Sequence, residues 1–213
     1  MKKKILIADD HPAIRLGVKQ ILSGHLSGCE FGEATQAADI VRKASEEKWD
    51  LIILDIDLPG RNGFEILNDL KSRDIKIPVL IFSIYSEDQV AVRALKSGAF
   101  GFLSKGADDK DLVSAVNQIL DGHRYVSASV TDLLISHVEN PERVAPHQLL
   151  SDREYQTMLL IASGKTITQI AKEFSLSTST INTYRSRILE KMGLNGNAEI
   201  MSYVIRNKLI PLT

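Results

Sequence analysis

The chain has 213 residues, 44% of them hydrophobic and 25% charged, which is an ordinary composition for a globular protein. This length fits one large domain or two modest ones. No apolar run approaches the roughly 20 residues of a membrane-spanning helix, and Asp9-Asp10 ends the first apolar stretch too early for a signal peptide. The single cysteine, Cys29, excludes an internal disulfide and fits a reducing compartment, and the five scattered histidines argue against a zinc site.

The formal net charge of −1 is unevenly divided along the chain. Residues 1–147 hold 18 Lys+Arg against 22 Asp+Glu, a balance of −4, whereas residues 148–213 hold 8 against 5, a balance of +3. The difference has the sense expected of an acidic regulatory or catalytic unit followed by a unit that binds a polyanion.

Up to about Gly122 the pattern alternates between buried strands and amphipathic helices. Strands are predicted at residues 4–8, 29–33, 50–54, 78–82 and 100–103. Helices are predicted at residues 13–23, 36–47, 63–72, 87–97 and 109–121, with Ser86 and Asp108 capping the last two. Right-handed crossovers cover both faces of such a sheet, which predicts a five-stranded parallel, doubly wound (flavodoxin-like) α/β domain at residues 1–122.

Polar side chains follow four of the predicted strands. They are Asp9 and Asp10 after the first strand, Asp55 after the third, Ser83 after the fourth and Lys105 after the fifth. The carboxyl ends of parallel strands meet at one edge of an open sheet, where sites are built. We therefore expect Asp10 and Asp55 to bind Mg²⁺, while Lys105 neutralises a phosphoryl group that an Asp55 oxygen attacks. His11, beside the acidic pair, is interpreted as a helix-start residue rather than a ligand.

This set of residues resembles the receiver domain of two-component response regulators, over residues 3–121. The resemblance implies that Asp55 takes a phosphoryl group from a sensor histidine kinase, and that the magnesium site consists of Asp9, Asp10, Asp55 and the backbone carbonyl of Asp57. It also implies that Ser83 hydrogen-bonds the phosphoryl group and that Phe102 turns inward as a switch. Simple core packing is the alternative role of Phe102. Gly106 departs from the proline that many receivers have after the lysine.

The character of the chain changes after residue 122. Residues 123–147 are interpreted as a linker with a short helix at 130–138, because Asn140-Pro141 through Ala145-Pro146 is typical of a loop. Residues 148–213 show only helical periodicity, which predicts a small all-α domain of four helices, the last at 197–208. Three of these helices have capping residues, which are Ser151, Thr166 and Ser177.

Residues 166–173 and 177–192 have the layout of a helix-turn-helix. A buried stripe with spacings of 3, 4 and 4 runs along the second helix, through Ile181, Tyr184, Ile188 and Met192. The opposite face carries short polar residues and arginines, which suit the major groove and the phosphates of duplex DNA. A small all-α interaction domain is the alternative.

Residues 149–209 resemble the four-helix LuxR-type DNA-binding module, and the whole chain resembles the NarL/FixJ class of transcription factors. The resemblance rests on motifs that include Leu150-Ser151-x-Arg153-Glu154, Gln169-Ile170-Ala171 and Thr180-Ile181-Asn182-x-Tyr184. It implies DNA contacts by Lys165, Thr180, Asn182, Thr183, Arg185, Ser186, Arg187 and Lys191. One short recognition helix reads few base pairs, so a homodimer on paired half-sites is expected. The resemblance implies that the last helix contributes to the dimer contact.

Together these features predict a cytoplasmic, DNA-binding transcription regulator, not an enzyme and not bound to a membrane, controlled by phosphorylation of Asp55 in a two-component phosphorelay. One alternative is an atypical receiver that acts through protein contacts, which the intact set of Asp10, Asp55, Ser83 and Lys105 disfavours. The other is a magnesium-dependent aspartyl phosphohydrolase. No second acid lies two residues beyond a nucleophile at the first strand to protonate a leaving group, which disfavours it.

Overall fold

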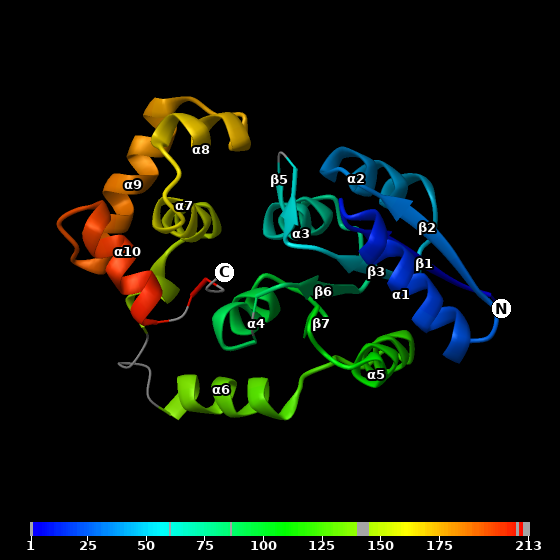
Figure 1. The fold of residues 1–213 in the computed structure, drawn as a ribbon. Helices are drawn as coiled ribbons and strands as arrows, with labels where there is room; N and C mark the ends of the chain where they lie inside the picture. The colour runs from blue at the N-terminus through cyan, green and yellow to red at the C-terminus, as the bar shows by residue number, and fades with distance from the viewer. Residues whose placement is uncertain (1, 60, 86, 140–144, 208, 211–213) are drawn as a thin grey trace. The chain divides into compact units, whose positions relative to one another are not determined.

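The computed structural model describes residues 2–59, 61–85, 87–139, 145–207 and 209–210 (Figure 1). Its contacts divide the chain into two compact units, Met1–Leu133 and Leu134–Thr213. None of the helices in these described ranges has the length and the apolar character needed to cross a bilayer. Ser86, expected to cap a helix, and residues 140–144 of the expected linker lie outside the described residues.

The first unit is built on a five-stranded parallel sheet in the order β2-β1-β3-β6-β7. Its strands are β1 (Lys3–Ala8), β2 (Cys29–Ala34), β3 (Leu51–Leu54), β6 (Val79–Ser83) and β7 (Gly101–Ser104). Helices α1 (Pro12–His25), α2 (Ala37–Glu46), α3 (Gly63–Ser72), α4 (Glu87–Lys96) and α5 (Asp109–Leu120) surround the sheet. The predicted α/β fold is confirmed, and each predicted boundary lies within two residues of the observed one.

Both faces of this sheet are covered. Helices α1 and α5 pack on one face, where Val18 and Leu112 join strand residues such as Ile5 in a buried cluster. Helices α2, α3 and α4 cover the other face (Figure 1). Every side chain of β3 is buried, as an apolar run in a covered parallel sheet requires. The central strands β3 and β6 therefore have no polar side chain before the last residue of β6, Ser83.

Two local features of the first unit differ from the sequence prediction. A short antiparallel ribbon, β4 (Asp57–Leu58) with β5 (Arg61–Asn62), occupies the segment expected to be a loop. The side chain of Asn62 accepts a hydrogen bond from the backbone N–H of Phe64 at 2.8 Å and so caps α3. Asp108 stands at the N-cap position of α5, but its side chain makes no capping hydrogen bond, so the expected cap is wrong in that detail.

The chain returns to the sheet after α5. The backbone N–H of Tyr125 donates to the carbonyl of Phe100 at 3.0 Å, and Tyr125 forms a parallel bridge with Gly101 at the edge of β7. A side chain at Gly101 would meet the Tyr125 backbone at 3.0 Å, so a larger residue here would push the two segments apart. Residues after 122 thus extend the first unit beyond the boundary that we expected.

A sixth helix, α6 (Ala128–Glu139), begins on the surface of the first unit. The hydroxyls of Ser127 and Ser129 donate to the carboxylate of Glu87 at the start of α4, the former at 2.7 Å. Val130, in the first turn of α6, is only 2% exposed. The helix expected at residues 130–138 is therefore present, and its first turn is held by α4.

The second unit is helical throughout its described part, as expected. It contains a 3₁₀ helix (Pro146–Leu149), α7 (Asp152–Ala162), α8 (Ile167–Phe174), α9 (Thr178–Met192) and α10 (Asn197–Arg206). Ser151 and Thr166 each form a complete capping box, and the side chain of Ser177 accepts from the Thr180 N–H, which confirms all three expected caps. Ser175, in the left-handed conformation with φ 54°, ends α8 and makes the turn into α9.

Candidate functional site

The acidic residues of the first unit meet at the carboxyl-terminal edge of the sheet. Asp9 and Asp10 follow β1, and Asp55 follows the adjacent β3, where its backbone N–H donates to the Ala8 carbonyl at 2.9 Å. Asp9, Asp10, His11 and Asp55 each present one ligand atom within 4.8 Å of the others. The sheet order therefore brings together side chains that are more than forty residues apart in the sequence.

Lys105 lies between two of these carboxylates. Its Nζ is 2.7 Å from Asp9 Oδ2 and 2.7 Å from Asp55 Oδ2. Asp9 and Asp55 are each 3% exposed, so both ion pairs are shielded from water. One ammonium against the three carboxylates Asp9, Asp10 and Asp55 leaves the site with an excess of negative charge, which suits a cation.

Burial sets the proton affinity of the central carboxylate. It raises the pKa of Asp55 to about 6, although the Lys105 ammonium lowers that pKa; Asp9 and Asp57 raise it further. Burial alone would lower the pKa of Lys105, but Asp55 and Asp9 outweigh it and raise that pKa. At neutral pH the pair is therefore a charged lysine beside a mainly ionised carboxylate that is more basic than a surface aspartate.

The two oxygens of the Asp55 carboxylate have different surroundings. Asp55 Oδ1 is buried and accepts no hydrogen bond from any residue in the described part of the chain. The start of α3 packs closely on the backbone of Asp55, because a side chain at Gly63 would come within 2.8 Å of the Asp55 backbone carbonyl oxygen. A buried, unpaired carboxylate oxygen beside Asp10 fits a hard divalent cation, for which oxygen ligands are preferred.

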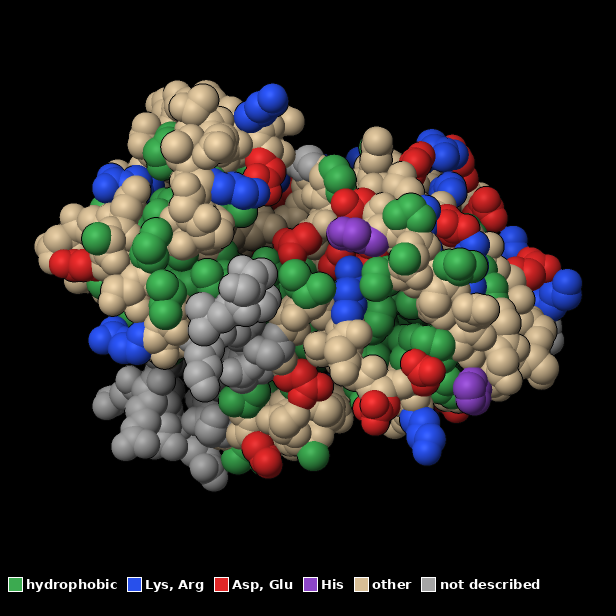
Figure 2. All heavy atoms as spheres, viewed as in Figure 1, with side chains coloured by type: hydrophobic (Ala, Val, Ile, Leu, Met, Phe, Trp, Pro, Cys, Tyr) green, Lys and Arg blue, Asp and Glu red, His purple; other side chains and the backbone are tan. Residues whose placement is uncertain are grey.

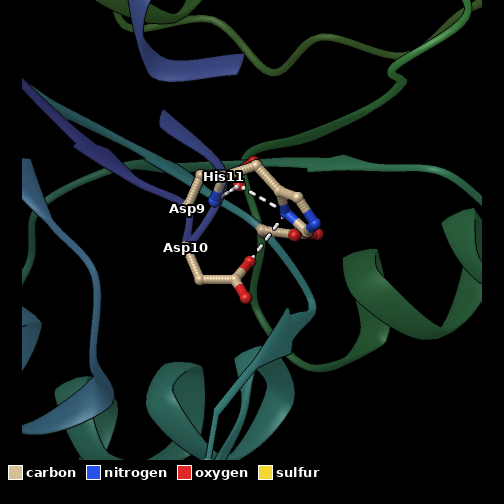
Figure 3. A group of neighbouring side chains, drawn as sticks. Asp9, Asp10 and His11 are labelled. Atoms are coloured by element: carbon tan, nitrogen blue, oxygen red, sulfur yellow. Dashed lines mark hydrogen bonds and ion pairs between the residues drawn. The ribbon is translucent and has the colours of Figure 1, made fainter. Parts of the chain in front are cut away.

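His11 stands at the mouth of this site, where the sequence led us to expect only a helix start. It is the N-cap residue of α1, and its backbone N–H donates to Asp9 Oδ1 at 2.8 Å. Figure 3 shows its imidazole turned back toward the carboxylates of Asp9 and Asp10. Figure 2 shows acidic and basic side chains interspersed over the visible face of the first unit.

The remaining predicted residues of this site lie at the same edge or next to it. Ser83 ends β6 and is fully buried, and its carbonyl accepts the backbone N–H of Lys105 at 2.7 Å. Phe102, in β7, is buried with 2% exposure. Asp57 belongs to the β4–β5 ribbon, two residues beyond Asp55.

The exposed face of α9 carries the side chains predicted to contact DNA bases. Asn182, Thr183 and Ser186 are all exposed, whereas Ile181 and Ile188 on the opposite face are fully buried. Thr180 is partly buried, and its hydroxyl lies 2.8 Å from that of the capping Ser177.

The four cations predicted to contact DNA differ in their surroundings. Arg187 is exposed and forms no ion pair within the described residues. Lys165 pairs with Glu173 at 2.5 Å, and Arg185 Nε donates to Asn197 Oδ1 at 2.6 Å. Lys191 Nζ lies 2.6 Å from Glu154 Oε2. The last three are therefore engaged inside their own unit.

Glu154 is the residue of this unit whose role the sequence did not reveal. It is 2% exposed, and its Oε2 accepts hydrogen bonds both from the Ser151 backbone N–H, at 2.7 Å, and from Lys191. The capping-box pattern predicted the first contact but gave no sign of the second, which joins α7 to the end of α9.

An α/β unit with an acidic, lysine-bearing sheet edge, followed by a helix-turn-helix unit, defines a two-domain regulator. Comparison with known families agrees with both halves. The response regulator receiver domain matches residues 5–117, and the luxR family of bacterial regulatory proteins matches residues 148–204. The chain belongs to the response regulators that join a receiver domain to a luxR-family regulatory domain.

Similar proteins match along nearly the whole chain. Response regulator UvrY of Escherichia coli is 29% identical over 206 residues, which are 96% of this chain and 94% of UvrY. Response regulator GacA of Pseudomonas aeruginosa is 31% identical over 209 residues, 97% of each chain. Among solved structures, RcsB from Salmonella enterica serovar Typhimurium bound to the promoter rprA with the phosphomimetic BeF3⁻ has a TM-score of 0.72 at 20% identity, covering 96% of this chain and 99% of RcsB.

Proposed function

We propose that this protein is a transcription regulator of a bacterial two-component system, in which a sensor histidine kinase phosphorylates Asp55 and the modified chain binds promoter DNA as a homodimer in the cytoplasm. Residues 1–122 would form the receiver, 123–147 the connection, whose first part to Leu133 packs on the receiver, and 148–213 the DNA-binding domain. The observation that carries the proposal is the buried Asp55 carboxylate. Its Oδ2 is paired with Lys105, and its Oδ1 has no hydrogen-bond partner among the described residues.

The chemistry assigned to this site is phosphoryl transfer to a carboxylate. An Asp55 oxygen attacks phosphorus, the bond from phosphorus to the donor's histidine nitrogen breaks, and an aspartyl phosphate forms. The Lys105 ammonium is placed to neutralise the added charge. A magnesium ion held by Asp9, Asp10, Asp55 and the Asp57 backbone carbonyl would supply further positive charge against the phosphoryl oxygens.

We assign the response to Ser83 and Phe102. A phosphoryl group adds roughly −1.5 to −2 charges and three acceptor oxygens at neutral pH. The Ser83 hydroxyl, buried at the end of the neighbouring strand, is the donor that we expect to reach one of these oxygens. Phe102 is already buried, so its switching role would consist of a change in packing within the covered sheet.

The DNA-binding role is assigned to α9. Its exposed polar residues, Asn182, Thr183 and Ser186, suit base edges in the major groove, and Arg187 suits a phosphate. Thr180, at the capped start of the helix, is retained as a DNA contact. Lys165, Arg185 and Lys191 would have to share or leave their present partners to contact DNA.

The test compares the wild-type chain with Asp55→Asn. Incubated with acetyl phosphate and Mg²⁺, the wild type should gain one phosphoryl group per chain by mass spectrometry, and Asp55→Asn should gain none. The labelled wild type should bind sheared genomic DNA with an affinity that falls as salt rises. Equal labelling of the two chains would overturn the site, and continuous release of phosphate without a labelled chain would favour a phosphohydrolase.

A further inference from the structure

The side chain of His11 has no part in the function proposed above, yet it faces the acidic site directly. Its Nδ1 lies 2.8 Å from Asp10 Oδ1 and 3.2 Å from Asp9 Oδ1, although the side chain is 66% exposed. Figure 3 shows the ring turned toward both carboxylates. This exposed imidazole thus lies within ligand distance of two carboxylates and is hydrogen-bonded to that of Asp9.

The local backbone fixes this position. His11 has extended φ and ψ of −85° and 112° and precedes Pro12, the first residue of α1. Its N–H is held by Asp9 Oδ1, in a turn closed by the aspartate side chain. The imidazole therefore starts from a position set by the strand–helix junction, and little ordering of the chain is needed for a ligand to use it.

The separations fit a metal coordination shell. In an octahedral shell with bonds of about 2.1 Å, neighbouring ligand atoms lie about 3 Å apart. The distances from His11 Nδ1 to the two carboxylate oxygens bracket this value. Asp55 belongs to the same group of residues, and its Oδ1, which is buried without a hydrogen-bond partner among the described residues, is an independent sign of a cation site.

A set of carboxylate oxygens with one imidazole nitrogen does not raise the affinity for every divalent cation equally. Magnesium prefers oxygen ligands and gains little from an imidazole, whereas Co²⁺, Ni²⁺ and Zn²⁺ accept nitrogen and oxygen together. We propose that His11 is a metal ligand through Nδ1, which enables the acidic site to bind divalent transition-metal ions more tightly than its three carboxylates alone would. The inference rests on the proposed function, in which the same carboxylates hold the cation.

The experiment measures metal affinity by isothermal titration calorimetry on the full chain, with MgCl₂ and CoCl₂ as probes. His11→Ala is expected to weaken Co²⁺ binding roughly tenfold or more, because even the loss of a group that only supports a ligand costs roughly 10–100-fold, and to leave Mg²⁺ affinity nearly unchanged. His25→Ala is the matched control, because His25 is an exposed histidine at the other end of the same helix. It should alter neither affinity.

A spectroscopic readout tests the bond itself. When Zn²⁺ is added to the ¹⁵N-labelled chain, the Nδ1 resonance of His11 should shift at one equivalent of metal while that of His25 stays in place. Unchanged Co²⁺ affinity in His11→Ala, or an unmoved Nδ1 resonance, would overturn the role of His11 and leave the magnesium site intact. Failure of the wild type to bind Mg²⁺ at all would instead count against the proposed function.

Discussion

Lys105 sets the charge balance of the acidic site, because its ammonium lies between two buried carboxylates. Asp9 and Asp55 have little access to water, which would otherwise screen their mutual repulsion. Removal of the lysine would leave these negative charges close together without compensation. We therefore expect Lys105 to stabilise the fold as well as to serve phosphoryl transfer.

Lys105→Ala is expected to lower the free energy of unfolding of the first unit by on the order of 3 kcal/mol, the usual cost of removing one partner of a buried ion pair. Combined with Asp55→Asn, it should cost less than the sum of the two single changes. Urea denaturation followed by the fluorescence of Trp49, the single tryptophan, reports on the first unit alone. Additive losses would mean that Lys105 and Asp55 do not interact.

Between elements, the Glu154–Lys191 pair joins the start of α7 to the last turn of the recognition helix α9. Burial alone would raise the pKa of Glu154, but hydrogen bonds from Lys191 and Ser151 outweigh it and lower that pKa below its ordinary value of 4.5. A carboxyl whose pKa is lowered by folding stabilises the fold at pH values above its unfolded pKa. That contribution is lost as the pH falls through the folded value.

Glu154→Gln is accordingly expected to lower the stability of the second unit at pH 7 by about 1–2 kcal/mol, a buried-pair cost discounted because Lys191 is 39% exposed. The difference from the wild type should shrink as the pH falls below about 4.5. Hydrogen exchange of the α7 and α9 amides measures it. As a control, Glu173→Gln, which breaks the exposed pair with Lys165, should change the stability little. If Glu154→Gln differed from the wild type by the same amount at every pH, the ionised carboxylate would not be the source of the stabilisation.

The contrast between these elements shows what the sequence could reveal. Strands such as Leu51–Leu54 and the boxes at Ser151 and Thr166 were predictable, because a run of apolar residues or a four-residue motif contains the whole signal. The edge position of Asp55 followed from the topology of a parallel sheet. The Glu154–Lys191 pair was hidden, because it spans 37 residues and the capping box already accounted for the glutamate.

For the whole molecule, the end of the first unit matters most, because the chain continues from there into the second unit. Residues 123–133 are packed on the sheet and on α4 and are not a free tether. Tyr125 is 8% exposed and Val130 is 2% exposed, and Glu87 accepts both serine hydroxyls. A shift of α4 would therefore move the start of α6 with it.

This arrangement predicts that a fragment of residues 1–133 is more stable than one of residues 1–122. The shorter fragment loses the burial of Tyr125 and Val130, worth roughly 2–4 kcal/mol together, along with the backbone hydrogen bond to Phe100. The urea midpoint of the 1–122 fragment, followed by Trp49 fluorescence, should be lower than that of the 1–133 fragment. A fragment of residues 1–139 should have the same midpoint as the 1–133 fragment. Tyr125→Ala in the full chain probes the same contact without a truncation, because it removes the buried ring and keeps the backbone bridge. If neither the deletion nor this substitution lowered the midpoint, residues 123–133 would be a passive connection, and movement of α4 would have to reach the second unit by another route.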